Sequence, residues 1–348
     1  MALGFDSAEL TQQTNNIYVP TGFITKLFFG DSKPTSSFMV KVHTTKGGRK
    51  LAPFVSPKIG GKVMSKKGKT VDTYEPALLK PKYITEADAI VEEQGVLYAD
   101  GLDPQERAED QLLKDEELLK NDVYRRVEHM CVSLVTTGKF TAVGDGVEEE
   151  FDYRMDSNNI EVLTGTALWT DPSSSPLDDL SNWADEIYKN TGDYPDSGVY
   201  GADVYSAFKK HPSVIEAFDT KNITIGSLAP APMLDENGEV LKGVVFAGHI
   251  SDLGMDIYRY VDFYDDDNNV AQDMFPKDKL VMGTKNSDGH VAYAGITDKK
   301  QLGTAVFVGE IFVKTWSQED PDDEYLLGKS KPLPVPSDID SFKCVKAV

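Results

Sequence analysis

The chain has 348 residues, of which 36 are Lys or Arg and 57 are Asp or Glu, giving a formal net charge of -21. A hydrophobic content of 40%, with 16 Phe and 15 Tyr, is typical of a folded globular protein and not of a disordered one. The negative charge argues against sequence-specific DNA binding, because an acidic surface repels phosphate.

The cysteines and the N-terminus indicate where the protein works. Cys131 and Cys344 are too few and too far apart for a disulfide framework or a thiolate zinc site, so we expect a reducing compartment and roles in packing. The first residues lack the basic and apolar regions of a signal peptide, and no apolar run approaches about 18 residues. We therefore expect neither export nor membrane insertion.

The segment 41–85 differs from the rest of the chain in its charge. It contains 11 basic and 2 acidic residues, so it carries +9 while the remainder carries -30. Prolines and glycines interrupt its apolar residues, a pattern that predicts an extended β-hairpin and not a helix. This basic arm is either a solvated surface hairpin or an arm that lies on the acidic surface of another copy.

A long amphipathic helix is predicted over 104–137. It begins with Pro104, repeats apolar residues at three- and four-residue spacing, and ends at Gly138. Such a helix spans roughly 50 Å and would pack as a strut along a sheet. A coiled coil is the alternative, but Glu116 and Arg126 interrupt the apolar stripe, so it does not hold a strict heptad.

The following region mixes short strands and helices. Alternating residues over 144–168 predict short strands and hairpins. A second helix opens at Ser175, which a proline and then an aspartate follow, and it stops at Gly192. A third helix over 202–210 is ended by Pro212. The remaining strand-like segments are 244–246, 257–263, 280–282, 291–294 and 304–316. This order of elements places the fold in the α+β class.

Motifs for catalysis or cofactor binding are weak. Gly68 to Thr70 imitates the end of a phosphate-binding loop, but Val63 stands where that motif needs glycine. Asp265, Asp267 and Asn269 alternate as calcium ligands do, yet the loop glycine and closing glutamate are missing, so we expect an exposed turn. The five histidines are scattered, and no serine elbow or dinucleotide glycine motif is present. We expect no catalytic residue, metal or cofactor, which favours a structural protein.

Several short motifs follow one another in a specific order. They are Leu-Phe-Phe-Gly at 27–30, Phe-Val-Ser-Pro at 54–57, Tyr-Glu-Pro at 74–76, Lys-Pro-Lys at 80–82, Asp-Glu-Glu-Leu at 115–118, Gly-Lys-Phe at 138–140, Trp169 with Asp-Asp-Leu at 178–180, Val-Met-Gly at 281–283, Asp-Pro at 320–321 and Pro-Leu-Pro at 332–334. From about residue 20 to the C-terminus, this order resembles the lambda-like phage major capsid protein E family.

The resemblance implies a Hong Kong 97-type capsid fold. Its expected parts are an N-terminal arm at 1–40, an extended β-hairpin loop at 41–85, a peripheral domain at 86–192 that holds the spine helix, an axial domain at 193–309, and a C-terminal return strand of the peripheral domain at 310–348. The implied function is that of a major head protein of a tailed bacteriophage, which self-assembles into hexamers and pentamers of an icosahedral shell enclosing double-stranded DNA. The acidic turn at 262–269 has no counterpart in the family and stays unassigned.

The resemblance also implies partners and a location. Besides other copies of the chain, portal, scaffolding and decoration proteins are expected partners. The DNA would be enclosed without sequence-specific binding, and no membrane contact is expected. The virion capsid is the expected location, after assembly in the host cytoplasm.

From charge, we expect the basic arm to lie on the acidic face of a neighbour's spine helix. The predicted interface residues are Phe54, Lys58, Lys62, Lys66, Lys67 and Lys69 on the arm and Glu106, Glu109, Asp110 and Glu117 on the helix. One exposed ion pair contributes only about 0 to 1 kcal/mol, but many repeated pairs fix the register between copies.

Two alternatives stay open at this point. An acidic cytosolic hydrolase would use a carboxylate pair and needs a concave pocket within one subunit. An encapsulin-like compartment shell would share the capsid fold but enclose a protein cargo in place of DNA.

Overall fold

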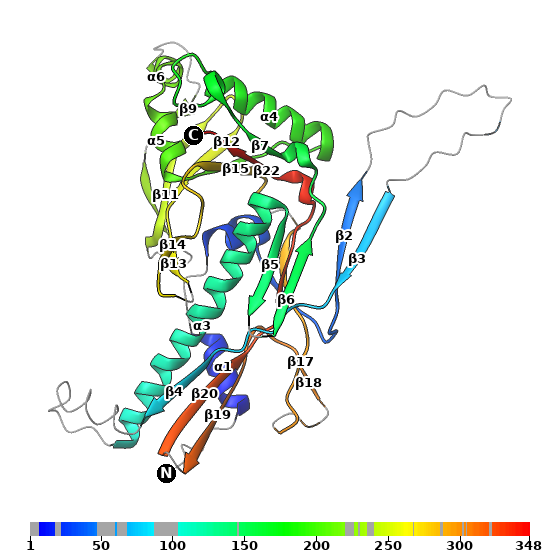
Figure 1. Ribbon diagram of the computed structural model, residues 1–348, viewed down its shortest axis with the longest axis vertical. Helices are drawn as coiled ribbons and strands as arrows, with labels where there is room; N and C mark the ends of the chain where they lie inside the picture. Colours follow the sequence, from blue (N-terminus) through cyan, green and yellow to red (C-terminus); the bar gives the residue numbers. More distant parts are fainter. Residues whose placement is uncertain are drawn as a thin grey trace.

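The structure is a computed structural model that describes residues 7–17, 22–46, 60, 68–86, 104–144, 146–219, 226–228, 230–234, 240–266, 268–285, 288–300, 303, 305–319 and 322–348. Figure 1 shows an elongated body, with a two-stranded stem projecting from one side. The helices are α1 (Ser7–Asn16), the π-helical turn η1 (Thr25–Phe29), α3 (Pro104–Thr137), α4 (Pro176–Thr191), α5 (Ala202–Lys210) and α6 (Pro212–Asp219).

An eight-stranded mixed sheet forms one end of the body. Its order is β10 (Ala231–Leu234), β11 (Val240–Ile250), β12 (Met255–Tyr260), β8 (Ser197–Tyr200), β15 (Lys279–Gly283), β22 (Lys343–Lys346) and β7 (Ile160–Val162), with β9 (Gly226–Ser227) also paired to β11. Helices α4, α5 and α6 pack on this sheet (Figure 1). Trp183 of α4 and Phe208 of α5 are buried in one apolar cluster with Ile257 of β12, and burial of such large side chains stabilises this end.

A smaller sheet forms the other end. It consists of β19 (Phe312–Glu319), β20 (Asp322–Lys329) and β4 (Lys82–Glu86), all antiparallel. One apolar cluster joins this sheet to α1 and α3, and it contains Leu10, Leu119, Val123, Val313 and Leu326. The spine helix α3 therefore reaches from this sheet to the larger core, as Figure 1 shows.

Smaller strand groups complete the body. They are β1 (Ser32–Pro34), β16 (His290–Tyr293) and β21 (Pro332–Val335) in one sheet, and the pairs β2 (Val40–Lys46) with β3 (Gly68–Tyr74), β5 (Lys139–Gly144) with β6 (Val147–Asp152), β13 (Phe263–Asp265) with β14 (Ala271–Asp273), and β17 (Ile296–Thr297) with β18 (Val306–Phe307). The β2–β3 pair is the stem of the hairpin predicted over 41–85, and the central part of that segment lies outside the described residues.

The two long helices were predicted correctly. Helix α3 spans the predicted residues, and it ends where Gly138 takes a φ of 72°, a conformation that glycine adopts without strain. Helix α4 begins with Pro176 and ends at Gly192, which has a φ of 98°. At its start, the Ser175 hydroxyl donates to Asp178 over 2.6 Å and does not cap a backbone amide, so the capping expected there is absent.

Some elements were missed or placed differently. Pro212 follows the end of α5, and it is also the first residue of α6. Proline is tolerated there because the backbone nitrogen at the first position of a helix donates no hydrogen bond within the helix. Helix α1 was not predicted, because its sequence SAELTQQTNN has too few apolar residues to show a helical period. The loop-like motif at 68–70 lies in β3, and the acidic turn joins β13 to β14, where Asp266 accepts from two backbone amides.

The predicted domain boundary near residue 192 divides one packed core. Strand β7 and helix α4, expected in the peripheral domain, lie with the eight-stranded sheet. Strand β22 lies there too, although its segment was expected to return wholly to the peripheral domain. These pairings cross the expected boundaries: β22 pairs with β15 across more than 60 residues and with β7 across more than 180, which no local pattern reveals.

Candidate assembly surfaces

The base of the basic arm is fixed to the body at β6. The Tyr74 hydroxyl donates to the carbonyl of Asp152 over 2.6 Å, and the Tyr74 ring lies 5.8 Å from that of Phe151. Across the same junction, Arg154 Nη2 is 3.2 Å from Asp72 Oδ1. The direction in which the stem leaves the body is therefore set by aromatic packing and one ion pair (Figure 1).

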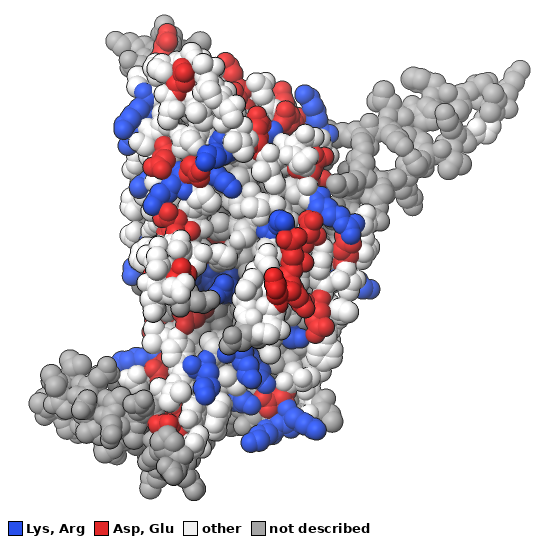
Figure 2. All heavy atoms as spheres, viewed as in Figure 1, with Lys and Arg blue, Asp and Glu red and all other residues white. Residues whose placement is uncertain are grey.

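Beside this junction, β6 presents an acidic stripe made of Glu148, Glu149 and Glu150. All three side chains are exposed, while the next residue, Phe151, is buried. Because side chains alternate along a strand, Glu148 and Glu150 share one face and Glu149 lies on the other. Lys139 of β5 pairs with Glu150 over 3.0 Å. Figure 2 shows acidic side chains gathered over this strand, so the stripe is a negative surface available to a basic partner.

The structure places only part of the predicted interface. Phe54, Lys58, Lys62, Lys66 and Lys67 lie outside the described residues, as do the side chains of Lys69, Glu106, Glu109 and Asp110. Glu117 is exposed on α3. In Figure 1 the stem and the first half of α3 lie on opposite sides of the body, so the described stem does not meet that helix face within one chain. The acidic stripe was missed, although three consecutive glutamates in an alternating strand signal it.

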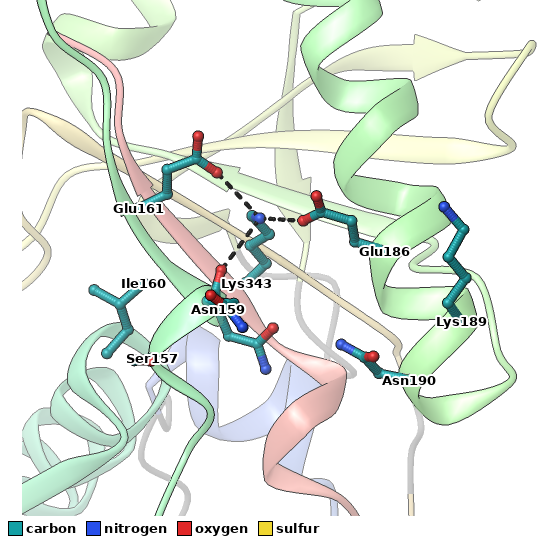
Figure 3. A pocket seen from close by; sticks show the side chains of 9 residues that line it. Ser157, Asn159, Ile160, Glu161, Glu186, Lys189, Asn190 and Lys343 are labelled. Carbon is teal, nitrogen blue, oxygen red and sulfur yellow. Dashed lines mark hydrogen bonds and ion pairs between the residues drawn. The ribbon is translucent and has the colours of Figure 1, made fainter. Parts of the chain in front are cut away.

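A recess of about 440 Å³ surrounds Lys343, and Figure 3 shows its lining. The Lys343 side chain is 2% exposed, and its ammonium donates to Glu161 over 3.1 Å, to the carbonyl of Asn158 over 3.3 Å and to Glu186. These three acceptors use the three donors of the ammonium. The two carboxylates therefore bind a buried cation, and this cluster connects β22 to β7 and α4.

This cluster predicts an asymmetric response to mutation. We expect Lys343→Met to change the free energy of unfolding by less than about 1 kcal/mol, because both glutamates reach water and Met keeps the contact with Trp183. The double change E161Q/E186Q should cost about 2 kcal/mol, because it leaves the buried ammonium without a counter-charge. Urea denaturation of the variants measures both, and a larger loss in K343M would contradict this account.

A buried carboxylate joins three elements elsewhere in the body. Glu128 of α3 is fully buried and accepts from the backbone amides of Ile24 and Thr25 at 2.8 and 2.9 Å, from the Thr25 hydroxyl at 2.7 Å and from the Tyr260 hydroxyl at 3.0 Å. Burial raises the pKa of Glu128, and these hydrogen bonds oppose that rise. The carboxylate links the segment at η1, the spine helix and β12, and it is closed to any substrate.

The described part of the chain has few other features typical of a metal site or a reactive thiol. No group of three His, Cys, Asp or Glu side chains there is arranged to hold a metal ion. Both cysteines are buried thiols, and burial raises the pKa of Cys344 to about 12. None of the helices in the described ranges is long and apolar enough to cross a membrane.

Comparison with known proteins identifies the family. The sequence pattern of the phage major capsid protein E family matches residues 6–347. The chain belongs to this family. It is 26% identical over 332 residues to the major capsid protein of Escherichia phage N15, and 26% identical over 334 residues to that of Escherichia phage lambda. Each match covers 92% of both chains.

The fold agrees with this assignment. A solved structure of a prophage capsid protein from E. coli CFT073 matches this capsid protein with a TM-score of 0.75 at 23% identity, covering 100% of both chains. The family and the capsid fold expected from the ordered motifs are therefore confirmed. The protein is a major capsid protein of a tailed phage and a component of the virion.

Proposed function

We propose that this capsid protein assembles into hexamers and pentamers that tile an icosahedral shell around the double-stranded phage genome. The observation that carries the proposal is family membership over nearly the whole chain, together with the β2–β3 stem of the arm, which is fixed at its base and projects from the body. Because the stem points away from its own body, we infer that the arm contacts another copy of the chain. The free energy of assembly then comes from apolar and charged surface buried between identical chains.

The charge distribution supports one contact in particular. The arm segment carries +9, and the acidic stripe on β6 is exposed near the arm base. We place the arm of one copy across the acidic stripe of its neighbour, together with the helix face that includes Glu117. The ten residues predicted from the sequence remain candidates for this interface, with Glu148, Glu149 and Glu150 added. Complementary charge sets the register of such a contact more than its strength.

The parts of the fold receive roles in the same proposal. The segment 1–40 serves as the N-terminal arm, 41–85 as the extended loop, and α3 with the β19–β20–β4 sheet as the peripheral domain. The eight-stranded sheet with α4, α5 and α6 serves as the axial domain, which includes β7 and β22.

The proposal extends to partners. Portal, scaffolding and decoration proteins would contact the shell, and the DNA would be enclosed without sequence-specific contacts. The net charge of -21 supports weak contact with DNA, because an acidic lining does not retain phosphate during packaging. Tight binding of duplex DNA by purified subunits that persists at high salt would contradict this part.

The same residues support a structural role without catalysis. Glu161 and Glu186 in the recess are bound to Lys343, and Glu128 is buried and saturated with hydrogen bonds. A hydrolase needs a carboxylate that substrate reaches, with its pKa tuned for proton transfer. The described carboxylates named here instead hold elements of the fold together.

Native mass spectrometry of the purified protein tests the capsomer proposal. We expect species with five and six times the mass of one chain, increasing with protein concentration. Detection of monomers and dimers alone, at every concentration and salt tested, would overturn it.

A further inference from the structure

Helix α1 covers the open edge of a sheet. Strand β19 is an edge strand of the β19–β20–β4 sheet, and such edges expose backbone groups that invite pairing. The Thr11 hydroxyl of α1 donates to the carbonyl of Val313 over 3.1 Å and accepts from its amide over 3.0 Å. Asn15 donates to the carbonyl of Ile311 over 3.2 Å. Side chains of α1 thus take the place of a neighbouring strand.

The end of α1 is held by a buried lysine of the spine helix. Lys120 is 3% exposed, and its ammonium donates to the carbonyls of Asn15 and Ile17 over 2.8 and 2.7 Å. Carbonyls at a helix C-terminus lack partners within the helix, so a cation there is stabilising. Because α1 is attached by side chains and carries no strand pairing to the sheet, it forms a unit that is able to leave without unravelling the sheet.

The docked helix leaves three buried acceptor oxygens, on two side chains, unsatisfied. Both carboxylate oxygens of Glu116 on α3 and the side-chain oxygen of Asn15 on α1 are buried without a hydrogen-bond partner. Glu116 is 0% exposed and lies near Thr14, whose hydroxyl donates to the carbonyl of Leu10 over 2.9 Å. An ionised carboxylate in such a place is costly, whereas a protonated one is neutral and brings a donor to an interface that has surplus acceptors.

Among the side chains that the structure describes, none with a charge compensates Glu116. Lys120, one turn away, points to the end of α1 and has Glu310 as its charged neighbour. On β19, Lys314 is 2.6 Å from Asp298. Burial raises the pKa of Glu116 to about 7, while its contact with the Thr14 side chain opposes the rise, and no charged group contributes to that shift. Other titratable residues on the packed elements include Asp115 of α3, Lys82 and Tyr83 of β4, and Asp323, Glu324, Tyr325 and Lys329 of β20. Helix α1 carries Glu9, whose side chain lies outside the described residues.

We propose that α1 is a proton-linked latch, which docks on α3 and the β19 edge while Glu116 is protonated and detaches as Glu116 ionises. In the detached state Glu116 is exposed to water, and its pKa returns to the ordinary value of 4.5. Docking is then strongest below that pH and weakens about tenfold for each pH unit up to about 7. Above pH 7 both states are ionised, and the total weakening levels off at about 300-fold. Detachment opens the β19 edge to another strand.

Hydrogen–deuterium exchange of the purified, unassembled chain tests the latch. The exchange of α1 amides is followed from pH 5 to pH 8 and corrected for intrinsic exchange rates, while peptides from β12 and β15 report global folding. In the wild type, we expect the protection of α1 to fall about tenfold for each unit between pH 5 and 7 and then to level off. Protection of α1 that does not change with pH would overturn the proposal without any variant.

A matched pair of variants isolates the carboxyl group. Glu116→Gln is neutral at every pH and keeps an N–H donor, so its α1 should stay protected up to pH 8. Glu117→Gln removes an exposed carboxylate one residue away and should keep the wild-type profile. A pH-dependent profile in E116Q equal to that of the wild type would overturn the role of Glu116.

Discussion

Replacing Glu128 by alanine is expected to lower the free energy of unfolding by about 3–5 kcal/mol. The change leaves four donors without their acceptor: the buried amide of Ile24 and hydroxyl of Tyr260, and the half-buried amide and hydroxyl of Thr25. Each unpaired buried donor costs about 1–3 kcal/mol, with partial relief as the site relaxes. Gly22 also lies so close that a Cβ there would overlap the carboxylate, so the chain is built around this group.

Urea denaturation followed by tryptophan fluorescence measures this effect. Glu117→Ala is the matched control, because it removes an exposed glutamate from the same helix and should cost less than about 0.5 kcal/mol. Glu128→Gln keeps one acceptor oxygen and should fall between the two. A loss in E128A no larger than that in E117A would show that the network does not hold the elements together.

Reversing the charge of Lys66, Lys67 and Lys69 to glutamate is expected to abolish shell formation while the single chain stays folded. Each reversal changes the charge by two, so the arm segment falls from +9 to +3. The net attraction of the arm to a neighbour's acidic stripe is weakened, and the three introduced glutamates oppose docking where they meet its carboxylates. Electron microscopy counts the particles, and circular dichroism checks the fold.

Compensating variants locate the partner surface. If the arm lies on the acidic stripe, changing Glu148, Glu149 and Glu150 to lysine in the reversed-arm chain should restore particles. Rescue by lysines at Glu106, Glu109, Asp110 and Glu117 would place the contact on the spine helix instead. If the arm variant alone formed normal particles, the three lysines of the arm would not be part of the interface.

The elements that the sequence predicted well are those whose signals are local. Helix α3 follows from a sustained apolar period between Pro104 and Gly138, and α4 from a proline at its start and a glycine at its end. The β2–β3 stem follows from glycine and proline punctuation between apolar residues. In each case the pattern lies within one stretch of chain, so no knowledge of distant partners is needed.

The parts that could not be predicted depend on distant contacts. Strand β22 lies between β15 and β7 because of pairings across more than 60 and 180 residues, and no local pattern shows them. Glu116 appeared in the sequence only as a break in an apolar stripe, whereas the structure buries it beneath α1. In the sequence, Glu128 does not differ from the other acidic residues of a charged helix. In the structure, η1 and Tyr260 bury it. Polar residues that the fold buries carry no mark of their burial in the sequence.

Electron microscopy of negatively stained protein, expressed alone and together with the genes upstream of its own, tests the central claim most directly. We expect closed icosahedral particles or capsomer rings, and particles that form during infection should hold DNA and not a protein cargo. Discrete monomers or dimers under every salt and concentration condition would contradict it.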